Sequence, residues 1–206
     1  MTNRGELRQT QQLERQFFER EPDVVARELI GSFATVRNGS SEIRARILET
    51  EAYGGEDDPA SHAFRGPTPR SAIMFGPAGH LYVYLSYGVH WCMNVVTGSE
   101  GTASAVLLRA AEVMASFECD IPSGDEVLLR GPGLLTRGLG ITGADNGTDC
   151  CREAPSRISF SSLPGCDVRV GQSARIGVSK GQERLSRYFV EGHHGISRRP
   201  PRIASR

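Results

Sequence analysis

Two runs of β-forming residues, separated by a three-residue turn signal, constrain the fold of this chain more than any other feature. Residues 81–85 and 89–96 are rich in Leu, Val and aromatic residues, and Ser86-Tyr87-Gly88 lies between them. This pattern predicts a β-hairpin. Tyr87 would then lie near the exposed tip, where a large aromatic ring is hard to explain as part of a core.

The rest of the chain predicts more strands than helices. A turn at Asn38-Gly39 predicts a hairpin between residues 32–37 and 43–53, and residues 104–113 are typical of a further strand. We expect two short strands within residues 161–178, a final strand within 184–198, and helices at 17–29, with Pro22 in the first turn of a helix, and at 125–141. Because strands follow one another more often than they alternate with helices, the expected class is α+β.

The 206 residues are enough for one domain with its own core. We expect a flexible polar arm at residues 1–15, one domain over 16–198 and a basic tail at 199–206. No apolar run reaches 18 residues, which argues against a membrane-spanning helix, and the polar N-terminus lacks the apolar core of a signal peptide. The protein is therefore expected to be cytoplasmic, or nucleoid-associated if bacterial.

Cysteine and charge content exclude several classes of protein. Five cysteines without a C-x-x-C pair argue against a disulfide framework and a four-cysteine zinc site. The 24 basic and 24 acidic residues balance, which argues against a grip on nucleic acid over the whole surface. Residues 175–206 nevertheless hold eight basic and two acidic residues, a net charge of +6. This region could contact phosphates without sequence specificity.

The first candidate for chemistry is the segment Glu49-Thr50-Glu51-Ala52-Tyr53. In a strand, Glu49, Glu51 and Tyr53 share one face. Two neighbouring carboxylates repel each other, so one of them can retain a proton or act as a base. The alternative is an ordinary exposed acidic face of a strand, which is the commoner role of glutamate.

Two other groups of residues are open to more than one interpretation. A metal-dependent hydrolase could use Glu49, Glu51, Asp57, Asp58 and His62, although their spacing matches no standard zinc motif. Tyr82 and Tyr84 share one face of the predicted strand, where they could pack in a core or form a surface on which a nucleic-acid base stacks.

Several ordered blocks resemble the alkyladenine (methylpurine, or 3-methyladenine) DNA glycosylases. They are ETEAY, His62, TPR with MF, LYVYLSYG, CMNV and VLLRA, followed by GPGLLTRGLGI, ARIGV and RYFVEG. The resemblance implies a single mixed domain around a curved antiparallel β-sheet with a protruding β-hairpin. It also implies a monofunctional enzyme without cofactor or metal, which acts on damaged purines in double-stranded DNA and is expected to be a monomer.

The same resemblance implies roles for individual residues. Glu51 would be the catalytic general base, Tyr53, His62 and Tyr84 would form the pocket for the extruded base, and Tyr87 would enter the DNA helix. Asn94 would reject normal guanine at its amino group, and Leu107, Arg109 and Arg70 would contact the nucleotide or its phosphate. Leu134 departs from the family pattern, which often has lysine there. A DNA-damage binding module without catalysis is the remaining alternative.

Overall fold

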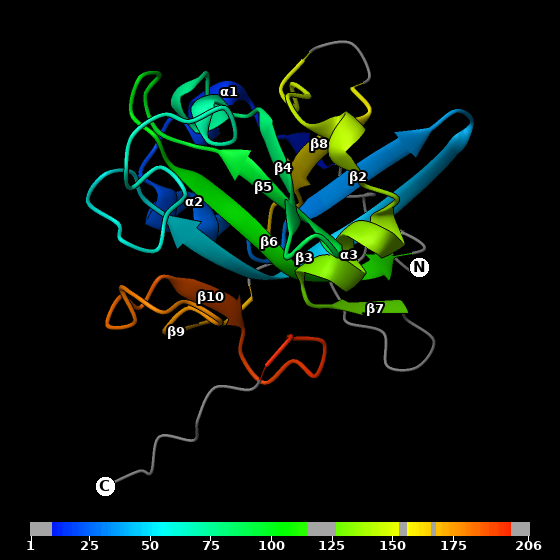
Figure 1. The fold of residues 1–206 in the computed structure, drawn as a ribbon. Helices are drawn as coiled ribbons and strands as arrows, with labels where there is room; N and C mark the ends of the chain where they lie inside the picture. The colour runs from blue at the N-terminus through cyan, green and yellow to red at the C-terminus, as the bar shows by residue number, and fades with distance from the viewer. Residues whose placement is uncertain (1–9, 115–126, 153–155, 166–167, 199–206) are drawn as a thin grey trace, which may run out of the picture.

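Two long antiparallel strands, β3 (Ser41–Tyr53) and β6 (Ala105–Met114), form the centre of the fold (Figure 1). The computed structural model describes residues 10–114, 127–152, 156–165 and 168–198. Each central strand has different neighbours along its two halves. β3 pairs first with β2 (Phe33–Asn38) and then with β10 (Arg187–Val190). β6 pairs first with β5 (His90–Val96) and then with β7 (Val127–Arg130).

The remaining described strands extend this sheet at its margins. β4 (Leu81–Ser86) pairs with β5, and β9 (Val170–Ser173) pairs with β10. β8 (Ile158–Ser162) lies beside β2 and carries the two-residue strand β1 (Gln11–Gln12). All pairings among the described strands are antiparallel, which confirms the predicted α+β class with an antiparallel sheet.

The pairing of β3 with β6 is irregular around Glu49. Ile47 pairs with Ala111, Glu49 with Ala110 and Thr50 with Leu108, so the register shifts on both sides of Glu49. Such bulges redirect side chains and often lie beside functional sites. This irregularity lies at the point where β3 carries the ETEAY segment.

Short helices cover the sheet. α1 (Arg15–Phe18) and α2 (Pro22–Glu28) confirm the helical prediction for residues 17–29, in two pieces, with Pro22 in the first turn of α2. α2 is fixed to the central strand by a hydrogen bond of 2.8 Å from Thr50 Oγ1 to the Ala26 carbonyl. α3 (Pro132–Leu139) packs on β5 and β6, and the 3₁₀ segments η1 (Ala72–Phe75) and η2 (Gly143–Asp145) lie in loops.

Two of the predicted boundaries were wrong. Residues 127–130 of the predicted helix at 125–141 form β7 instead, because their backbone pairs antiparallel with β6, from Val127 with Val113 to Arg130 with Ala110. Gly131, with φ of 104°, separates that strand from α3. Of the two strands expected within 161–178, β9 lies there, whereas β8 begins at Ile158.

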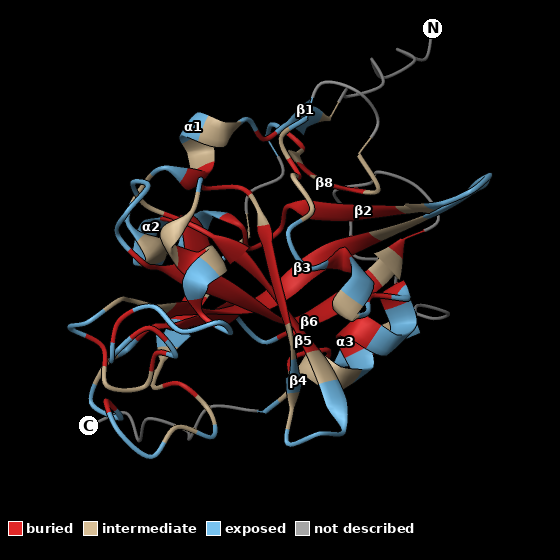
Figure 2. Cartoon of the chain, turned by 45° about the horizontal axis from the view of Figure 1, so that its top comes forward, coloured by how far each residue is buried: buried red, intermediate tan, exposed pale blue. Residues whose placement is uncertain are grey.

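The predicted hairpin is confirmed as β4 and β5, and its tip protrudes from the molecule (Figure 2). Val89 N donates to the Ser86 carbonyl at 3.0 Å, which closes the turn. Tyr87 is 95% exposed and has a φ of 49°, a left-handed conformation that is strained for a residue with a Cβ. The hairpin therefore holds an aromatic ring outside the core at a cost in backbone energy.

Part of the predicted N-terminal arm contacts the sheet, since Gln11 and Gln12 pair with Ser162 and Ser161. Residues 1–9 and 199–206 lie outside the described residues, and the boundaries of the arm, domain and tail stay predictions. Among the described residues, no helix is both long and apolar enough to cross a membrane.

Candidate active site

A cavity of about 810 Å³ opens between the β4–β5 hairpin and the segment that follows β9. β3, β4, β5 and β6 each contribute side chains to its wall. The wall includes every residue that the resemblance assigned to the pocket, the helix wedge or the nucleotide: Tyr53, His62, Arg70, Tyr84, Tyr87, Asn94, Leu107 and Arg109. The fold thus brings together residues that lie up to 56 positions apart in the sequence.

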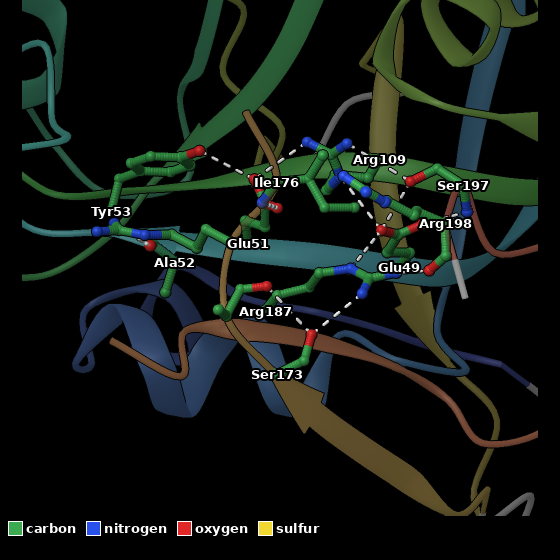
Figure 3. Close-up of polar contacts among 12 residues, drawn as sticks. Glu49, Glu51, Ala52, Tyr53, Arg109, Ser173, Ile176, Arg187, Ser197 and Arg198 are labelled. Atoms are coloured by element: carbon green, nitrogen blue, oxygen red, sulfur yellow. Dashed lines mark hydrogen bonds and ion pairs between the residues drawn. The ribbon is translucent and has the colours of Figure 1, made fainter. Parts of the chain in front are cut away.

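Glu51 lies directly behind this wall rather than in it. Its side chain is fully buried, and three residues of the wall donate hydrogen bonds to its carboxylate (Figure 3). Tyr53 Oη and Arg109 Nη1 contact Oε2 at 2.9 and 3.1 Å. Ile176 N contacts Oε1 at 2.7 Å. The carboxylate is therefore held in a polar environment beside the cavity, not among apolar side chains.

The surroundings of Glu51 affect its pKa in opposite directions. Burial disfavours the charged form and raises the pKa of Glu51 above its ordinary value of 4.5, and Glu49 adds to the rise. The Arg109 charge and the hydrogen bonds from Ile176 and Tyr53 act against it. Burial raises the pKa of Tyr53 well above 10, so its hydroxyl stays protonated and remains a donor.

The interpretation of Glu49 and Glu51 as an exposed acidic face is wrong, because both side chains are fully buried. Glu49 Oε1 accepts from Arg187 Nε at 2.7 Å and from Arg109 Nε at 3.2 Å. Arg109 thus bridges the two glutamates (Figure 3). Sequence reasoning assigned Arg109 to a phosphate, a role that stays a prediction, whereas its contacts in the structure hold it against these carboxylates.

Aromatic rings form one side of the cavity. Tyr82, which the resemblance did not assign to the pocket, lies beside Tyr84 with ring centroids 5.2 Å apart. The His62 ring meets Tyr84 nearly edge-on at 4.6 Å, and His62 Nδ1 lies 2.8 Å from the Tyr82 hydroxyl. Desolvation and the charge of Arg70 lower the pKa of His62 from 6.5, so the imidazole is neutral at neutral pH.

The neighbouring strands β5 and β6 also contribute to the cavity wall. Asn94 and Leu107 are cross-strand partners and both line the cavity. Asn94 Nδ2 donates to the Tyr82 carbonyl at 2.9 Å, which fixes the amide beside the aromatic wall. At the rim, Arg70 lies over the Tyr84 ring at 4.7 Å and donates to the Leu85 carbonyl at 3.2 Å. Leu134 projects from α3 and is 53% exposed.

Three contributors to the site were not predicted from the sequence, although Arg175 and Ile176 lie in the ARIGV block. Ile176 acts through its backbone N–H, which any residue except proline would supply. Arg175 binds Asp58 with both terminal nitrogens and lies over the Tyr53 ring at 4.6 Å. Ser197 donates to Glu49 from near the end of the described chain.

The structure does not favour the metal-hydrolase hypothesis. The acidic residues that it requires are paired with arginines: Glu49 with Arg187 and Arg109, Asp58 with Arg175, and Asp57 with Arg184. Among residues 10–114, 127–152, 156–165 and 168–198, no three His, Cys, Asp or Glu side chains are grouped to hold a metal ion. The described cysteines, Cys92, Cys150 and Cys151, are free thiols.

Comparison with known proteins agrees with this geometry. A sequence model of the methylpurine-DNA glycosylases matches residues 16–194. A candidate 3-methyladenine DNA glycosylase of Frankia casuarinae is 46% identical, over 90% of this chain and 92% of its own length. Proteins with the same name from Nocardia farcinica and Burkholderia lata are 44% and 41% identical, over 88–90% of this chain and 90% of their own lengths. This chain therefore belongs to the methylpurine-DNA glycosylase family and is a DNA glycosylase, a hydrolase of base excision repair.

Proposed function

We propose that this protein extrudes alkylated or deaminated purines from double-stranded DNA and hydrolyses their N-glycosidic bonds by direct attack of water. The observation that carries the proposal is the buried Glu51 carboxylate, held behind the cavity wall by Tyr53, Arg109 and Ile176. A water between this carboxylate and a bound nucleotide would lose its proton to Glu51. The ionised carboxylate would also stabilise the positive charge that develops on the sugar.

The cavity suits a flat, electron-poor base. Purines alkylated at a ring nitrogen are cationic, and the faces of Tyr53 and Tyr84 attract cations by about 0.5–2 kcal/mol. The neutral imidazole of His62 has one donor and one acceptor nitrogen, so it can hydrogen-bond to the edge of a base. Asn94 lines the cavity beside the aromatic wall, where its amide could reject the amino group of guanine.

Extrusion requires that the gap left in the DNA be filled, and Tyr87 is the side chain that we propose fills it. Unstacking a base costs a few kcal/mol, and less where pairing is already damaged. Tyr87 is exposed at the tip of the hairpin and is among the residues that line the cavity. Insertion of such a ring between base steps would offset the cost.

Replacement of Tyr87 tests its role in filling the gap in the DNA separately from its effect on folding. Tyr87→Gly is expected to stabilise the protein slightly, by up to about 1 kcal/mol, because glycine adopts the left-handed conformation without strain. The same change is expected to lower single-turnover excision from duplex DNA at least about tenfold, since a few kcal/mol of unstacking is no longer offset. Excision from single strands should change little. Tyr87→Phe is the control and should behave as wild type; a duplex rate unaffected by Tyr87→Gly would contradict the wedge role.

The pH dependence tests the state of Glu51. The proposed step needs the ionised carboxylate, and burial holds its pKa above 4.5. The single-turnover rate should therefore fall as the pH drops through this raised pKa, starting at a higher pH than an ordinary glutamate would allow. Quenched reactions between pH 4.5 and 8 on hypoxanthine, whose departure involves no fixed positive charge, would measure this fall in rate, the acid limb of the pH profile. A rate that stays constant down to pH 4.5 would contradict the assignment.

A further inference from the structure

Glu49 is a fully buried carboxylate to which four donors converge. Arg187 Nε, Arg109 Nε and Ser197 Oγ contact Oε1 at 2.7, 3.2 and 2.8 Å, and Ser197 N contacts Oε2. These donors come from β10, β6 and the C-terminal segment, so three elements meet at one side chain (Figure 3). Glu49 does not line the cavity.

We propose that Glu49 is a positioning residue that holds Arg109 against Glu51 and the C-terminal segment against Arg109, which sets both the direction and the basicity of the Glu51 carboxylate. The inference rests on the proposed function, because it assigns Glu49 a part in the reaction only if Glu51 is the base. Glu49 acts through Arg109, which touches both carboxylates.

The irregular pairing of β3 with β6 explains why Glu49 can take this part. The register passes from Glu49–Ala110 to Thr50–Leu108, so Arg109 is the extra residue of β6 at this step. Its guanidinium reaches Glu49 with Nε and Glu51 with Nη1. Because the two contacts use different nitrogens, Glu49 fixes the orientation of the guanidinium without displacing it from Glu51.

Glu49 also affects how readily Glu51 accepts a proton. The charged or titratable groups around Glu51 are Glu49 and Tyr53 from β3, Arg109 from β6, Arg187 from β10 and Arg175 after β9. The negative charge of Glu49 repels that of Glu51. Glu49 also interacts with the positive charge of Arg109, which the two glutamates therefore share. Without it, Arg109 would pair with Glu51 alone, and Glu51 would become a weaker base.

The C-terminal segment belongs to the same arrangement. Ser197 binds Glu49 through both its backbone N–H and its hydroxyl, and Arg109 Nη2 lies 3.5 Å from that hydroxyl. Arg187, which pairs with Glu49, also donates to the Arg198 carbonyl. The segment therefore closes over the glutamate and the arginine, and excludes water from the side of Arg109 away from the cavity.

The test is the pH dependence of Glu49→Gln in single-turnover excision on a hypoxanthine duplex. We expect a rate about tenfold or more below wild type at neutral pH, because Arg109 loses its second partner. We also expect the acid limb to move to lower pH by about half a unit or more, since removal of the Glu49 charge lowers the pKa of Glu51. General destabilisation would lower the rate without moving this limb downward. Glu42→Gln, on the same strand in an exposed pair with Arg44, is the control and should match wild type.

Glu49→Gln leaves Arg187 without its buried counter-charge, so the variant could lose its fold. Glu49→Gln combined with Arg187→Gln removes both charges and restores the balance; it should show the same downward shift of the acid limb. If neither variant melts cooperatively, Ser197→Ala decides, because it removes one contact to Glu49 and no charge. That variant should keep the wild-type melting temperature and lose several-fold in rate.

The outcomes separate this inference from the proposed function. A wild-type protein that excises no base would overturn the proposed function. An active wild type, with an acid limb unmoved in a folded Glu49→Gln or Glu49→Gln/Arg187→Gln variant, would overturn only the role of Glu49. If neither Glu49 variant folds, a wild-type excision rate in Ser197→Ala would likewise overturn only the role of Glu49.

Discussion

Glu51→Gln is expected to bind a lesion-bearing duplex and to leave its base in place. A general base contributes about 10²–10⁴ to a rate, so single-turnover excision should fall by about 10³-fold or more. Glutamine has the same shape and keeps one oxygen that can accept from Ile176 N or from Tyr53 and Arg109. Binding, measured by titration of a labelled duplex, should therefore change little.

Glu100→Gln is the matched control, because Glu100 is an exposed glutamate in the loop between β5 and β6. Its rate should equal that of wild type. Equal rates in Glu51→Gln and wild type would remove Glu51 from the mechanism. Lesion-selective binding without any abasic product from the wild type would instead support a damage-binding module.

The second large effect concerns stability, and it depends on the ion pair between Arg175 and Asp58. Both side chains are almost fully buried, and both terminal nitrogens of Arg175 contact the carboxylate. Arg175→Met would leave the Asp58 charge buried without its partner, which costs about 3–5 kcal/mol. For a chain of this size the melting temperature should fall by about 6–20 °C. Arg184→Met is the comparison, because Arg184 pairs with an exposed Asp57 and should contribute at most about 1 kcal/mol.

The stability that this ion pair contributes also depends on pH. Hydrogen bonds from Arg175, Gly54 and Ala60 outweigh the desolvation of Asp58, and hold its pKa below the ordinary value of 3.8. A carboxyl with a depressed pKa stabilises the fold above its unfolded pKa, and loses that contribution as the pH falls through its folded value. In Arg175→Met the buried Asp58 lacks its partner and its pKa is raised above that in the unfolded chain, so the difference in melting temperature between wild type and variant should be largest near pH 7 and shrink as the pH falls. A difference that stays constant to pH 2 would show that the charge of Asp58 is not responsible.

Local sequence patterns were sufficient for the strands and for the hairpin tip. The β-forming residues of 81–85 and 89–96 predicted β4 and β5, and a tyrosine next to glycine at the turn predicted the exposed Tyr87. The sequence pattern wrongly predicted a helix at residues 127–130. The four-residue strand, Gly131 and the helix that follows together have the apolar content of one longer helix. Four residues are too few to separate a period of two from one of 3.6.

The buried charges could not be predicted in the same way. Glutamate is usually exposed, so Glu49 and Glu51 gave no local signal of burial. Apart from Tyr53, their partners come from strands and loops 58 to 148 positions away, as for Arg109 with Glu51 and Ser197 with Glu49. The register shift at Glu49, which turns these groups toward each other, depends on the pairing of β3 with β6 and not on either strand alone.

The arginines inside the fold bear on how the enzyme searches DNA. Four of them, Arg46, Arg109, Arg175 and Arg187, are buried in ion pairs with Glu112, Glu51, Asp58 and Glu49. Arg175 and Arg187 account for two of the positive charges of the basic stretch 175–206, and Asp58 and Glu49 neutralise these two charges inside the fold. The attraction of this stretch to a polyanion is therefore weaker than its number of arginines suggests. The approach to DNA then depends on the basic residues outside these buried pairs.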